Sequence, residues 1–176
     1  MKNRLIKLCS VTVLLSLLFV GCNSGVLTNS STNKDEGTSI DIYLDAPSLS
    51  DKTEDDIIAL YGEPESIDEW KYERFSDGLT YAIRTLSYTK SNGEYWEFSF
   101  NNDLLQRISI DDCNISFDKK SDVMGLFGCK KYSNTETTDT NAALRYTNCG
   151  VSDLWAWSVE DNVIKGIKIS YSDLFK

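Results

Sequence analysis

The sequence predicts an α+β fold, in which two repeats of a short helix plus an antiparallel β-meander form one continuous sheet with the helices on one face. Two observations lead to this prediction. Blocks of similar residues recur in the same order in the two halves of the chain, and within them apolar and polar residues alternate with the period of a β-strand. Because a repeat of about 60 residues buries little surface alone, the two repeats are expected to share a core.

Three pairs of matching blocks define the repeats. They are Asp56–Gly62 with Asp122–Gly128, Leu86–Thr89 with Leu144–Thr147, and Trp96–Leu105 with Trp155–Ile164. The first repeat is assigned to residues 39–111 and the second to residues 112–176. Matching blocks in one order are hard to obtain by chance, so the internal repeat is weighed before any shorter motif.

Each repeat is predicted to begin with a short helix. Thr53 and the acidic residues after it are typical of an N-terminal capping turn, because acidic side chains favour the positive end of a helix. Gly62 suits the left-handed conformation that ends many helices, and Pro64 prevents continuation. The second repeat has Ser121 and Gly128 in the same roles.

An antiparallel meander is predicted to follow the first helix. The segments Thr80–Thr89 and Glu94–Asn101 flank Asn92-Gly93, and an Asn-Gly pair between two such runs is a strong hairpin signal. A second turn at Asn102-Asp103 leads into a strand over Leu104–Ile110.

Alternation assigns the side chains to two faces of the sheet. The core face is predicted to carry Leu86, Tyr88, Trp96, Phe98, Phe100, Leu104, Ile108 and Ile110, and in the second repeat Leu144, Tyr146, Trp155, Trp157, Val159, Val163, Ile167 and Ile169. An exposed aromatic stripe of this kind would instead suit a sugar-binding platform, which is the alternative. The opposite face mixes aromatic and polar groups, and binding is expected there, at Tyr81, Tyr95, Glu97, Arg145 and Ser158.

Residues 1–22 resemble the signal of a bacterial lipoprotein. Three basic residues precede the apolar run Leu8–Val20, which fits a signal peptide and is short for a membrane span of about 20 residues. The run ends in Val20-Gly21-Cys22, which resembles a lipobox. The resemblance implies a signal peptide at residues 1–21 and lipidation of Cys22. An ordinary secretory signal or a retained anchor helix is the alternative.

Residues 22–38 are predicted to form the lipidated cysteine and a flexible tether, because Asn, Ser, Thr, Gly and charged residues there cannot offset the entropy of ordering. Loss of the three basic residues of the signal changes the net charge from −9 to −12. This charge argues against nucleic acid as a partner. The membrane is expected as a partner only through the lipid anchor at Cys22.

The chain contains no His, which excludes Ser-His-Asp and Cys-His catalysis and any His-based zinc site. No phosphate-binding loop and no nucleotide-binding glycine pattern is present. We therefore predict no catalytic residue, no metal ligand and no cofactor.

Three cysteines remain once Cys9 leaves with the signal and Cys22 is lipidated. A Cys129–Cys149 disulfide is predicted, because Cys129 follows the glycine that ends the second helix and Cys149 lies at a predicted hairpin tip of the same repeat. The first repeat has no cysteine at either place. Cys113–Cys129 and Cys113–Cys149 pairings stay open as alternatives.

Residues 40–176 resemble the small lipoprotein domains of the SmpA/OmlA outer-membrane assembly family. Gly62-Glu63-Pro64 and Tyr95-Trp96-Glu97-Phe98 carry this resemblance. Two such units in tandem also resemble the β-lactamase inhibitory protein fold, in which a concave sheet grips a partner. Neither family implies catalysis. The predicted function is that of a membrane-anchored extracytoplasmic lipoprotein that binds a protein, and the alternative is a small enzyme or carbohydrate-handling module of the cell envelope.

Overall fold

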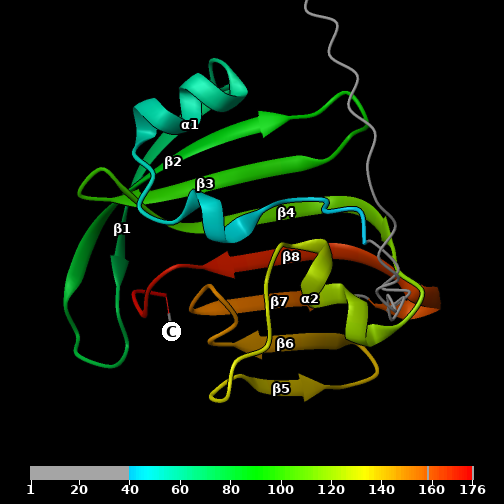
Figure 1. The fold of residues 1–176 in the computed structure, drawn as a ribbon. Coiled ribbons are helices and arrows are strands. Elements are labelled where there is room, and N and C mark those ends of the chain that lie inside the picture. Colours follow the sequence, from blue (N-terminus) through cyan, green and yellow to red (C-terminus); the bar gives the residue numbers. More distant parts are fainter. Residues whose placement is uncertain (1–39, 158, 176) are drawn as a thin grey trace, which may run out of the picture. The chain divides into compact units, whose positions relative to one another are not determined.

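Eight strands form one antiparallel sheet in the computed structural model, which describes residues 40–157 and 159–175 (Figure 1). Their order across the sheet is β1-β2-β3-β4-β8-β7-β6-β5. The strands are β1 (Ser66–Glu73), β2 (Thr80–Thr89), β3 (Tyr95–Asn101), β4 (Leu104–Ser116), β5 (Glu136–Asp139), β6 (Ala143–Thr147), β7 (Asp153–Trp157) and β8 (Val163–Ser170). The helical segments are η1 (Ala46–Leu49), α1 (Glu54–Tyr61), η2 (Lys120–Asp122), α2 (Val123–Leu126) and η3 (Glu160–Asn162), where η marks a 3₁₀ turn.

The predicted α+β class with helices on one face is wrong, because the described part of the chain is mainly β. Its two α-helices have eight and four residues. Irregular chain and 3₁₀ turns supply most of the remaining cover of the core. The second helix is short because Asp122, which precedes it, makes no side-chain cap. The Ser121 hydroxyl bonds to the Asp122 carboxylate instead of to the helix backbone, and Gly125 within the helix weakens it further.

The first helix begins and ends where the sequence predicts. The Thr53 hydroxyl accepts from the Asp56 N–H at 3.2 Å, while the Asp56 carboxylate accepts from the Thr53 N–H at 3.1 Å. Gly62 ends the helix with a φ of 86°. Ile57 is fully buried, whereas Leu60 is 58% exposed, so the apolar face of α1 is narrow.

β4 and β8 join the two halves of the sheet. Ile108 lies opposite Ile169 and Ile110 opposite Ile167, and all four side chains are fully buried. Farther along, the register shifts between Asp111 and Ile115. The β2–β3 pairing agrees with the predicted hairpin, since Thr89 lies opposite Tyr95 beside the turn.

The face predicted for β7 is wrong by one residue. Leu154 and Ala156, not the two tryptophans, are buried against β8, where they lie opposite Ile169 and Ile167. Trp155 is 41% exposed on the other side of the sheet. In the first repeat the predicted core residues are buried except Leu104, which is exposed at a turn.

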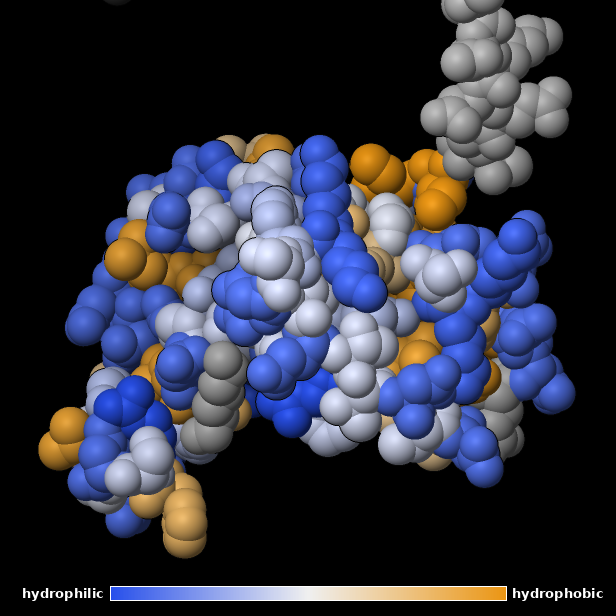
Figure 2. Space-filling view, turned by 60° about the horizontal axis from the view of Figure 1, so that its bottom comes forward, coloured by the Kyte–Doolittle hydropathy of each residue, from blue (hydrophilic) through white to orange (hydrophobic). Residues whose placement is uncertain are grey.

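The two edge strands β1 and β5 were not predicted from the sequence. The β1–β2 hairpin projects from the rest of the sheet, and Figure 2 shows apolar atoms at the end of this projection, at the lower left. Phe75 is fully exposed in its loop. Among the described helices, none is long and apolar enough to cross a membrane.

Candidate interaction surface

One side of the sheet carries the core, and we call the other side the open face. Strand register places aromatic and charged side chains from seven of the eight strands on this open face. They include Trp70, Tyr72, Tyr81, Tyr95, Glu97, Arg107, Arg145, Asp153, Trp155, Trp157 and Lys168.

Four of the five predicted binding residues lie on the open face, and all four are half-buried. Tyr81 is on β2, Tyr95 and Glu97 are on β3, and Arg145 is on β6. Ser158 lies outside the described residues. Three strands separate β3 from β6, which is about 19 Å at the usual strand spacing. The predicted residues therefore share a surface without forming one cluster.

The second half of the open face is built around two tryptophans. The rings of Trp155 and Trp157 meet edge to face, with centroids 6.4 Å apart. The Arg145 guanidinium lies 5.7 Å from the centre of the Trp155 ring and also binds Asp153 through two nitrogens, at 2.7 to 3.1 Å. Lys168 lies 5.6 Å from the centre of the Trp157 ring. Each of the two tryptophan rings thus lies beside a cationic side chain.

The first half of the open face is covered in part by Phe175, which follows β8. Its ring lies 6.3 Å from Trp70 and 5.0 Å from Tyr72, measured between centroids. The Arg107 guanidinium lies 4.0 Å from the centre of the same ring. The Trp70 indole N–H donates to the Thr85 hydroxyl at 3.0 Å, which fixes this ring on the sheet.

Glu97 and Arg107 lie in the middle of the open face, and both are partly desolvated. Burial raises the pKa of the Glu97 carboxyl, and the positive charge of Arg107 opposes this shift. Burial also lowers the pKa of the Arg107 guanidinium. The Arg107 Nε is buried and has no hydrogen-bond partner among the described residues. An unpaired buried donor of this kind lowers the stability of the fold.

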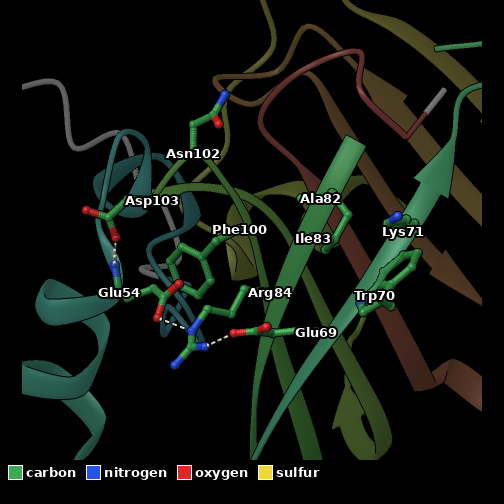
Figure 3. A pocket seen from close by; sticks show the side chains of 10 residues that line it. All are labelled: Glu54, Glu69, Trp70, Lys71, Ala82, Ile83, Arg84, Phe100, Asn102 and Asp103. Carbon is green, nitrogen blue, oxygen red and sulfur yellow. Dashed lines mark hydrogen bonds and ion pairs between the residues drawn. The ribbon is translucent and has the colours of Figure 1, made fainter. Parts of the chain in front are cut away.

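A pocket of about 530 Å³ lies between the start of α1 and strands β1 and β2 (Figure 3). Arg84 spans it, with its Nε 2.8 Å from Glu54 and a second nitrogen bound to Glu69. The Glu54 N–H donates to Asp103 at 3.3 Å. Because both glutamates bind the same arginine, these three side chains form an ion-pair network at the pocket. Within the described residues no cluster of metal-ligating side chains is present.

Cys129 and Cys149 lie in contact as buried, free thiols. A hydrogen bond from Cys129 lowers the pKa of Cys149 and raises that of Cys129. Cys113 instead donates to the Ile164 carbonyl at 3.5 Å, and burial raises its pKa to about 12. The contact agrees with the pairing that the sequence favours, and the disulfide itself stays a prediction.

No family model matches this sequence, and comparison with curated proteins gives no match. Among solved structures, the chain is similar to an extracellular protein containing an SCP domain from Bacillus anthracis str. Ames, with 11% sequence identity and a TM-score of 0.40. The similarity covers 82% of this chain and 50% of that one. Similarity at this level carries no argument about fold or function, and it does not test the family resemblances stated above.

Sequence reasoning missed several members of the open face. Trp70 and Tyr72 lie on the unpredicted strand β1, although Trp70-Lys71-Tyr72 alternates as a strand does. Trp155 and Trp157 were placed in the core. Arg107 was not selected, because nothing in the sequence shows that its side chain is half-buried against the Phe175 ring.

The first prediction concerns Gly166, over which Trp157 lies. An added Cβ at this residue would be 2.0 Å from Trp157 Cε2, so the ring has to move. We expect Gly166→Ala to lower the free energy of unfolding by about 1–3 kcal/mol, measured by chemical denaturation. In the background of Trp157→Ala the same change should cost nothing. An equal loss in both backgrounds would contradict this account.

The second prediction is that oxidation joins Cys129 to Cys149. Non-reducing peptide mapping of the folded protein should give a cross-linked peptide containing both. Reduction should then lower the free energy of unfolding by about 3 kcal/mol, since the bond closes a loop of about 20 residues. A cross-linked peptide containing Cys113, or three thiols open to alkylation after oxidation and unfolding, would overturn the assignment.

Proposed function

We propose that this protein is a lipid-anchored, extracytoplasmic, non-catalytic module that binds a partner protein through the open face. The observation that carries the proposal is the display of Trp, Tyr and Arg side chains across one side of a sheet whose other side is the core. These residue types are enriched at the centres of protein interfaces, where a few of them supply most of the binding energy.

The chemistry of the open face favours a protein over a sugar. The rings of Trp155 and Trp157 are inclined at 75°, so they do not form a flat platform for a sugar ring. Positive and negative groups alternate across the strands, with Glu97 and Arg107 in the first half and Arg145 and Asp153 in the second. Such alternation suits the mixed charges of a protein surface and fixes the register of a complex.

The anchor and the location outside the cytoplasm rest on the sequence of residues 1–22, which lie outside the described residues. A basic start, a short apolar run and Val20-Gly21-Cys22 together support export and lipidation. The polar residues 23–38 would then link the folded part to the membrane with a random-coil reach of roughly 20–25 Å.

The third prediction tests the open face. In pull-downs of the purified protein against envelope and secreted proteins, Trp155→Ala and Tyr95→Ala should each weaken capture of the same partner, because truncating a central anchor costs more than about 2 kcal/mol, or about thirtyfold in affinity. Leu60→Ala, an equally apolar truncation on the exposed side of α1, is the matched control and should have no effect.

Thermal unfolding of the same variants separates binding from stability. Trp155→Ala should leave the melting temperature within a few degrees of the parent, because the side chain is 41% exposed. Equal loss of capture by Leu60→Ala, or a large drop in melting temperature with unchanged capture by Trp155→Ala, would refute the proposed surface.

The fourth prediction tests the anchor. Intact mass of the protein purified from bacterial membranes should show a chain that starts at Cys22 and carries diacylglyceryl. Cys22→Ser should abolish both the added mass and the retention in the membrane fraction. A mature chain that begins elsewhere, or that lacks the lipid mass, would rule out lipidation.

A further inference from the structure

Strand β1 is an exposed edge of the sheet. It pairs with β2 on one side through eight residue pairs in an unbroken register, and no described strand lies on its other side (Figure 1). Every residue of β1 except Tyr72 is exposed, and the strand contains neither proline nor a bulge. An edge of this kind is a template for another strand. The opposite edge, β5, has only four residues.

The hydrogen bonds of the β1–β2 hairpin show which backbone groups are free. The Arg74 N–H donates to the Leu79 carbonyl at 2.9 Å, and these two residues continue the register in which Glu73 lies opposite Thr80. Hydrogen-bonded pairs alternate along an antiparallel ladder, so the even-numbered residues of β1 bond toward β2. The N–H and C=O groups of Ile67, Glu69, Lys71 and Glu73 therefore point away from the sheet.

The charged side chains of these outward-bonding residues can form opposite-charge pairs with those of a second, identical strand. In an antiparallel pair of identical strands, a two-fold axis at Trp70 places Glu69 opposite Lys71 of the second copy, and this contact occurs twice. An axis at Asp68, Glu69 or Lys71 would instead place two identical charges directly opposite each other, which is unfavourable. An axis at Tyr72 would leave a shorter overlap, because β1 ends at Glu73.

We propose that β1 pairs with β1 of a second copy of this chain, antiparallel and centred on Trp70. Two eight-stranded sheets then continue into each other, and the Glu69–Lys71 pairs fix the register. Lys71 makes no ion pair with any described residue, and the Glu69 carboxylate is largely exposed in its bond to Arg84, so both charges are accessible to a second copy. Because the two-fold axis is perpendicular to the sheet, the open faces of the two copies also lie side by side.

Cross-linking of the full-length protein tests the register. At the axis the two Trp70 residues form a non-hydrogen-bonded pair, whose Cα atoms are about 4.5 Å apart, within reach of a disulfide. Trp70→Cys should give a covalent dimer under mild oxidation on a non-reducing gel. Tyr72→Cys is the control, because four residues along the strands separate it from its mate by about 13 Å. The parent protein gives the background from the native cysteines.

Charge reversal tests the same register in a protein that keeps Trp70. Sedimentation of the detergent-solubilised chain should show a dimer that Glu69→Lys and Lys71→Glu each weaken about tenfold, because each leaves like charges opposed. The double variant Glu69→Lys/Lys71→Glu should restore it. A monomer at all concentrations, equal cross-linking at residues 70 and 72, or a double variant no better than either single one would overturn the proposal.

Discussion

The pairing of β4 with β8 is the contact on which the rest of the sheet depends. Among the described strands, β1 to β3 are joined to the second half of the sheet only through β4, and β5 to β7 are joined to the first half only through β8. The join is made by buried isoleucines, Ile108 and Ile110 facing Ile169 and Ile167. Without it both halves would expose a long central edge and half of their apolar layer. The same pairing brings Arg107 and Lys168 onto one continuous open face.

Cover for the core comes mainly from chain that is neither helix nor strand, and specific hydrogen bonds hold it there. Tyr43 and Leu44 both donate from their backbone N–H to the Leu126 carbonyl, which ties residues before η1 to the end of α2. The Tyr43 hydroxyl donates to the buried Glu94 carboxylate at 2.7 Å, and the Tyr171 hydroxyl donates to the Ala46 carbonyl at 2.9 Å. Irregular segments can be buried because such bonds satisfy their polar groups.

Local signals in the sequence predicted the elements that local chemistry determines. The Thr53 capping turn and the Asn92-Gly93 hairpin are found where they were expected. The face of β7 could not be read in this way, because Leu154, Trp155, Ala156 and Trp157 are apolar on both faces. The repeat matching aligned Trp96 with Trp155, and a slip of one residue moves every side chain of a strand to the other face. The neighbouring strand decides the outcome, since Gly166 leaves room only for Trp157 and Ile167 covers Ala156. For the same reason sequence reasoning placed Trp155 and Trp157 in the core, whereas it placed Tyr95 and Glu97 on the opposite face.

Contacts within the folded chain hold the cationic side chains of the open face in place. Three of its cations each lie against an aromatic ring: Arg107 against Phe175, Arg145 against Trp155 and Lys168 against Trp157. Long cationic side chains usually lose rotamer entropy when they bind, and stacking on a ring removes part of that loss in advance. If the open face binds a partner, as proposed, apolar contact with Trp155 would therefore need little rearrangement of this sheet.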